Sequence, residues 1–157
     1  MSHNIDWATL SAATLFANGQ SLTQGSYKTI AFDPTKSSAA HGISVIRGNL
    51  TYDSTDNCVI VGDGISAIEV SANLALQNGQ TGESYWGVIS INDTVAANRI
   101  VSNNGYMTTG QYSMVSMAPA TLSVQSGDKI RLLVYTSSST ASVRGENAFT
   151  YLTVKQV

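Results

Sequence analysis

The sequence predicts an all-β fold, an antiparallel sandwich or barrel of short strands in one domain. Three observations lead to this prediction. The length of 157 residues is typical of a single domain. Apolar and polar residues alternate with a period of two from about residue 43 onward. Clusters of Gly, Asn, Asp and Ser, which favour turns, separate the alternating segments. Alternation alone does not distinguish an immunoglobulin-like sandwich from a jelly roll.

The clearest predicted strand spans residues 65–77. Its residues Ile68, Val70 and Leu74 share one face and Glu69 and Asn73 share the other, as expected of a half-buried strand. The other predicted strands are residues 26–32, 42–52, 57–62, 85–91, 111–118, 121–125, 129–135 and 149–157. The polar segment 136–147 is expected to form the loop between the last two strands.

The first 25 residues lack this alternation and are expected to form an extended or partly helical N-terminal arm. Residues 26–157 are then the single folded domain. The arm has five large apolar side chains suited to docking on a neighbouring surface: Ile5, Trp7, Leu10, Leu15 and Phe16.

The composition limits the classes of function. Charged residues make up only 11% of the chain, whereas Ser and Thr supply 37 of the 157 positions. Such a surface suits a protein that binds neighbouring subunits, because interface cores are depleted of charge. The net charge of -2 argues against nucleic-acid binding. No apolar run is long enough to span a membrane, and no signal-peptide pattern opens the chain, so a soluble protein made in the cytoplasm is expected.

The residues that usually carry catalysis are scarce. His3 and His41 are the only histidines, and neither lies in a motif that would activate a serine. Cys58 is the only cysteine and lies in the apolar run CVIVG, where burial is the expected role. We therefore expect no catalytic residues and no enzymatic activity.

Acidic and glycine-rich segments are expected to form turns. The stretch YDSTDN places Asp53, Thr55 and Asn57 at alternate positions, and their oxygen atoms are of the kind that binds calcium. The turn is the favoured interpretation, because Asp and Asn side chains initiate turns and the EF-hand glycine and glutamate are missing. The sequences GDG (62–64), NG (78–79) and NNG (103–105) are turn signals of the hairpin type and lack the spacing of a phosphate-binding loop. No metal and no cofactor is expected.

The sequence SGDK, residues 126–129, is also predicted to be a turn. Leu122 and Val124 alternate with polar residues before it, and Ile130, Leu132 and Val134 alternate after it. Because no base accompanies Ser126, its hydroxyl is not expected to act as a nucleophile.

Several of these segments resemble one known superfamily. Residues 121–134, TLSVQSGDKIRLLV, combine a strand, a Gly-Asp turn and an apolar strand, and residues 149–157, FTYLTVKQV, form a final strand that opens with an aromatic residue. Residues 65–77 and 85–100 add two further matches. With these motifs, Thr51 to Val157 resembles the jelly-roll superfamily of the complement globular head and tumour necrosis factor. The chain departs from the family pattern where Ile68 and Val70 replace a glycine and an aromatic residue.

The resemblance implies a jelly-roll sandwich of roughly 8–10 strands that assembles as a homotrimer. One sheet of each subunit would then face the threefold axis. Leu133 and Tyr135 are candidate interface residues, because they lie on the strand face opposite Leu132. Phe149 and Tyr151 on the last strand are further candidates.

Domains of this type are similar to small bacteriophage virion proteins. The expected function is therefore a trimeric decoration or head-fibre protein on the virion surface, docked on the major capsid protein and synthesised in the host cytoplasm. The alternative is a trimeric receptor-binding or carbohydrate-binding module of a phage tail or bacterial surface. Such a module would bind a host-surface glycan through exposed aromatic residues; the candidates are Tyr85, Trp86, Tyr106 and Tyr112.

Overall fold

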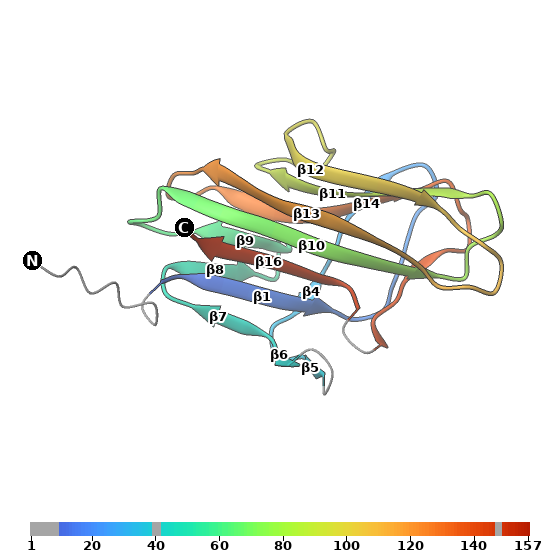
Figure 1. Cartoon of the computed structure of the whole chain (residues 1–157), viewed down its shortest axis with the longest axis horizontal. Coiled ribbons are helices and arrows are strands. Elements are labelled where there is room, and N and C mark those ends of the chain that lie inside the picture. The colour runs from blue at the N-terminus through green and yellow to red at the C-terminus, as the bar shows by residue number, and fades with distance from the viewer. Residues whose placement is uncertain (1–9, 39–41, 147–148) are drawn as a thin grey trace, which may run out of the picture.

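The protein is a sandwich of two antiparallel β-sheets (Figure 1). The computed structural model describes residues 10–38, 42–146 and 149–157. Sheet A contains β1 Ala12–Ala17, β2 Gln20–Ser21, β4 Phe32–Asp33, β7 Val45–Arg47, β10 Ala67–Gln77, β13 Ser113–Ser123, β15 Ser142–Val143 and β16 Tyr151–Gln156. Sheet B contains β3 Tyr27–Thr29, β8 Leu50–Asp53, β9 Cys58–Val61, β11 Ser84–Ile91, β12 Arg99–Tyr106 and β14 Lys129–Thr136. The strands β5 Ser37–Ser38 and β6 Gly42–Ile43 form a separate small hairpin. The predicted all-β class is confirmed.

The strand order is that of a jelly roll. Eight principal strands follow one another along the chain: β1, β9, β10, β11, β12, β13, β14 and β16. The first pairs with the eighth, the second with the seventh, the third with the sixth and the fourth with the fifth. These pairs produce the orders β1-β16-β10-β13 and β9-β14-β11-β12, so most connections cross between the sheets. The alternation pattern did not distinguish an immunoglobulin-like sandwich from a jelly roll, and the strand order is that of the jelly roll.

The core lies between the two sheets. The predicted face of β10 is buried, and Ile68, Val70 and Leu74 have no exposed surface. Ile130 and Leu132 of β14 meet them from sheet B and are equally buried. Apolar side chains from two inner faces thus form one core, as in other β-sandwiches. Within the described residues, no helix has the length and apolar composition needed to cross a membrane.

The SGDK sequence forms the predicted turn. The Asp128 N–H donates to the Gln125 carbonyl at 3.1 Å, and Gly127 has a φ of 93°, which glycine adopts readily. The Asp128 carboxylate accepts the Gln125 N–H at 2.9 Å and the Asn92 side-chain amide at 2.8 Å. The Ser126 hydroxyl donates to Asp63 at 2.6 Å. These side chains therefore hold a turn in shape.

The prediction of an arm extending to residue 25 was wrong. Residues 12–17 form β1, which pairs with β16 on one side and with β4 and β7 on the other. Leu15 has no exposed surface and Phe16 is 2% exposed, so neither is free to dock on a capsid. Leu10 is half-buried beside the last residues of the chain. Ile5 and Trp7 lie outside the described residues, as do the two histidines.

Candidate functional site

The outward-facing side of sheet A is poor in charge. We call this surface the outer face; it consists of the side chains of β1, β7, β10, β13 and β16 that point away from the core. Paired strands place these side chains in rows. One row contains Thr14, Thr153 and Ser71, and the next contains Phe16, Tyr151, Asn73 and Ser116. The side chains of these rows have hydroxyl groups, an amide and aromatic rings, and none is charged.

The charged residues of the outer face lie together at one end of sheet A. Arg47 pairs with Ala12, Ala12 with Lys155, and Lys155 with Glu69. Among the described residues of these five strands, the other outward-facing positions are uncharged. The middle of the outer face is therefore neutral and its charges are at the border.

Aromatic side chains gather toward the opposite end of the outer face. Phe16 and Tyr151 meet edge to face, with their ring centroids 6.1 Å apart. The Arg144 guanidinium lies 3.5 Å from the Tyr112 ring centroid and 4.8 Å from that of Phe149, within the range of cation–π contacts. Arg144 also pairs with Glu146 at 3.7 Å. The predicted interface residues Phe149 and Tyr151 are both half-buried here.

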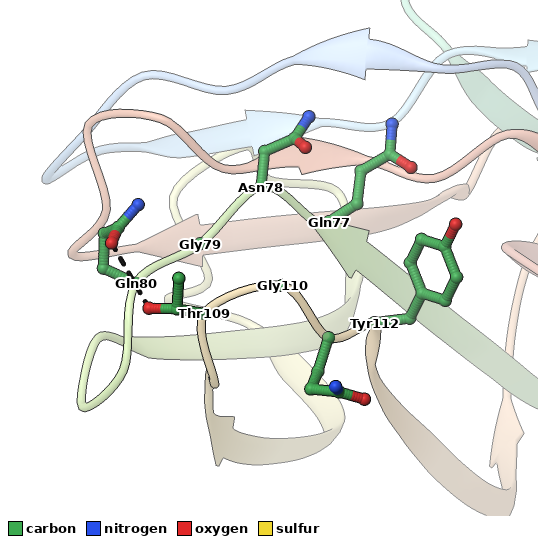
Figure 2. Close-up of a pocket in the computed structure, with 8 residues that line it drawn as sticks. Gln77, Asn78, Gly79, Gln80, Thr109, Gly110 and Tyr112 are labelled. Carbon is green, nitrogen blue, oxygen red and sulfur yellow. Dashed lines mark hydrogen bonds between the residues drawn. The ribbon is translucent and has the colours of Figure 1, made fainter.

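A polar cleft lies beside this aromatic group, between the β10–β11 turn and the β12–β13 turn (Figure 2). Its volume is about 400 Å³. The lining residues are Gln77, Asn78, Gly79, Gln80, Thr109, Gly110, Gln111 and Tyr112. Four of them have side-chain amides and none is charged. Figure 2 shows the side chains of Gln77, Asn78 and Tyr112 projecting on the same side of the two turns.

The two turns that form the cleft are bonded to each other. The Thr81 N–H donates to the Thr109 hydroxyl at 3.0 Å, and the Thr109 N–H donates to the Thr81 hydroxyl at 3.1 Å. A Cβ atom at position 79 would lie 1.8 Å from the Met107 sulfur, so any residue other than glycine would require the buried Met107 to shift. The walls of the cleft are therefore set by the fold.

The outward side of sheet B is covered at Leu133 by the chain itself. Leu133 has no exposed surface, because it packs with Val88 and Ala96 and contacts Tyr27. Ala96 belongs to the 92–98 loop, in which the Asp93 carboxylate accepts the N–H groups of Val95, Ala96 and Asn98. The prediction that Leu133 faces a neighbouring subunit was wrong, since its own chain fills that position.

Tyr135 lies on the same side of sheet B. Its half-buried ring lies 5.4 Å from Tyr27 and 5.4 Å from Trp86, measured between centroids. Tyr135 and Tyr151 therefore lie on opposite sides of the sandwich, because they belong to different sheets. The four predicted interface residues do not form one continuous surface.

The four predicted ligand-facing aromatic residues have different environments. Tyr85 is 2% exposed and points into the core, where burial raises the pKa of its hydroxyl, so its prediction was wrong. Trp86 is half-buried against Tyr135. Tyr106 is 73% exposed on the edge strand β12, outside the cleft. Only Tyr112, 58% exposed, lines the cleft.

The segment 53–58 forms the expected turn. Asp53, Asp56 and Cys58 have potential ligand atoms within 4.8 Å of one another, the one such group among the described residues. Asp53 accepts the N–H groups of Thr55 and Asp56, and the Asp56 carboxylate bonds Lys129, which lowers its pKa. Burial raises the pKa of the Cys58 thiol. The Asp53 carboxylate therefore stabilises the turn, and the Asp56 carboxylate connects the turn to β14.

The sequence interpretation missed most of the cleft. Gln77, Gln80 and Gln111 were not singled out, nor was Arg144. One feature would have indicated Gln80 and Gln111: both turns have glycine followed by glutamine, in NGQTG (78–82) and TTGQY (108–112). Pairing these two turns required the strand order, which the sequence alone did not provide.

No protein-family model matches the chain, and no curated protein has a significant similarity to it. The class that the structure defines is therefore the antiparallel jelly-roll sandwich, with a neutral outer face on sheet A and a polar cleft at one end.

Proposed function

We propose that the protein is a non-enzymatic structural component of a bacteriophage virion, a decoration or head-fibre protein. In this proposal it is synthesised in the host cytoplasm, assembles as a homotrimer and docks on the major capsid protein. The observation that carries the proposal is the neutral outer face of sheet A. The jelly-roll strand order and the resemblance of residues 51–157 to a trimer-forming superfamily add support.

The outer face suits contact with another subunit. Interface cores are depleted of Lys, Glu and Asp and surrounded by a polar rim. The outer face follows this pattern, with Thr14, Thr153 and Ser71 in its middle and Lys155 and Glu69 at its border. The outward side of sheet B lacks this property, because the 92–98 loop already covers Leu133. Sheet A is therefore the side that we assign to assembly.

The test is the solution mass of two matched variants. Thr153 lies in the middle of the outer face, whereas Ser102 lies exposed on β12 in sheet B. We expect the native protein to have three times the mass of the 16.5 kDa chain in light scattering. Thr153→Glu should be monomeric, because burying an unpaired carboxylate at an interface is strongly unfavourable, and Ser102→Glu should remain trimeric. A monomeric native protein would refute the trimer, and a trimeric Thr153→Glu variant would refute the outer face of sheet A as the interface.

Docking on a capsid is tested separately. Cosedimentation of the purified protein with expanded capsids should be saturable and should weaken when residues 1–9 are deleted. Deletion to residue 25 is unsuitable, because it would remove β1 from sheet A. The alternative function is a trimeric receptor-binding or carbohydrate-binding module, and it predicts that the protein does not bind capsids. The observation that favours this alternative is the polar cleft.

A further inference from the structure

We propose that the cleft between the β10–β11 and β12–β13 turns binds a neutral saccharide of one or two sugar units. This site lies where β10 ends, at the aromatic end of the outer face and beyond its neutral middle, and one chain supplies all of the lining residues named above. A monomeric protein could therefore still bind sugar, and a trimer could form even if no sugar binds. The two proposals can fail independently.

The size and chemistry of the cleft match such a ligand. Its volume of about 400 Å³ falls in the range of small-molecule sites, roughly 300–1,000 Å³. Gln77, Asn78, Gln80 and Gln111 each have a side-chain amide that can both donate and accept hydrogen bonds, as sugar hydroxyls do. Among the described residues that line the cleft, none is a cation that would select phosphate or an anionic sugar, and none is a carboxylate that would select a metal ion.

Tyr112 provides a stacking surface at the edge of the cleft. The Arg144 guanidinium covers one side of its ring at 3.5 Å from the centroid, yet Tyr112 remains 58% exposed. An aromatic ring that is covered on one side and open to solvent on the other can pack its open side against the C–H groups of a sugar. Arg144 is in turn held by Glu146, so the ring is supported before a ligand arrives.

The polar groups of the cleft divide into two sets. One set is occupied by the fold: Thr109 accepts from Thr81, and Thr140 donates to the Asn78 carbonyl at 2.6 Å. The other set is free. Among the described residues, the side-chain amides of Gln77 and Gln111 have no hydrogen-bond partner. The fixed set holds the turns in position, and the free set is available to a ligand.

The experiment uses the full-length protein on an array of neutral and sialylated glycans, followed by saturation-transfer NMR with methyl glycosides of glucose, galactose, mannose and N-acetylglucosamine. Tyr112→Ala and Gln77→Ala test the cleft. Tyr106→Ala is the matched control, because Tyr106 is more exposed than Tyr112 and lies outside the cleft. Melting temperatures confirm that the variants fold, and Gln111→Ala replaces any variant that does not.

We expect saturable binding of neutral glycans that weakens about tenfold in Tyr112→Ala and about fivefold in Gln77→Ala, and is unchanged in Tyr106→Ala. Three outcomes would overturn the proposal. They are the absence of saturable binding to any glycan, binding restricted to sialylated glycans, and equal binding by the Tyr112→Ala and Tyr106→Ala variants.

Discussion

Replacement of Leu133 by alanine tests whether sheet B is covered by its own chain. Leu133 has no exposed surface although it points away from the main core. Its environment is a small apolar cluster with Val88 and Ala96, contacted by Tyr27. If the 92–98 loop is a fixed part of the fold, Leu133 must contribute to stability like a core leucine.

The expected cost follows from the complete burial of this side chain. Truncating a buried leucine to alanine costs about 3 kcal/mol, from lost transfer energy and the cavity left behind. With a denaturant slope of about 2 kcal/mol per molar urea, the unfolding midpoint should fall by about 1.5 M. Leu133→Asp should unfold the chain, because its carboxylate would be buried without a partner.

The assay is urea unfolding followed by circular dichroism at fixed protein concentration, since assembly would make stability depend on concentration. Val95→Ala is the matched control, because Val95 belongs to the same loop but is 66% exposed, and it should change stability by less than about 0.5 kcal/mol. A cost below about 1 kcal/mol for Leu133→Ala would refute the reasoning, because a leucine buried in a fixed cluster costs more. It would mean that the loop does not cover Leu133 in solution.

Two further predictions concern titration. Burial raises the pKa of Asp93, but three backbone N–H groups of its own loop outweigh burial and hold the pKa below its usual value. Its contribution to stability is therefore complete above the unfolded pKa of about 3.8 and is lost as pH falls through the lower folded pKa. Hydrogen exchange of the 92–98 loop should accelerate in that acid range, and Asp93→Asn should remove this acid dependence; an unchanged profile would contradict it. The Cys58 thiol is 1% exposed and its pKa is raised, so a thiol reagent at pH 8 should modify it only after unfolding in urea. Equally fast reaction of the native protein would show that Cys58 is accessible.

The fold class could be predicted because alternation is strong wherever one side of a strand is buried. The segment 65–77 and the SGDK turn illustrate this, since apolar spacing and glycine are local signals. β1 was missed because its sequence AATLFA has alanines at two of its three core positions, which weakens the alternation. β13 was divided into two strands because a bulge opposite Val70 and Ala72 shifts the register within it.

A different reason explains why the cleft and the burial of Leu133 could not be predicted. Both depend on contacts between segments far apart in the sequence. The cleft requires the turns at 77–82 and 107–112 to meet, and Leu133 is covered because Ala96 folds over it. Alternation places Leu133 on the side away from the core, but it contains no information about which part of the chain covers that side.

The two ends of the described chain leave the sandwich at the same end. The Gln156 N–H donates to the Ser11 carbonyl at 2.8 Å, and Ile68, at the beginning of β10, pairs with Gln156. The cleft begins at Gln77, where β10 ends, so the 11 residues of β10 separate the two by about 30 Å (Figure 1). A tag, linker or fusion partner attached at the C-terminus would therefore leave the cleft facing away from its attachment. Immobilisation through the C-terminus would orient every copy alike, with the sugar-binding candidate outermost.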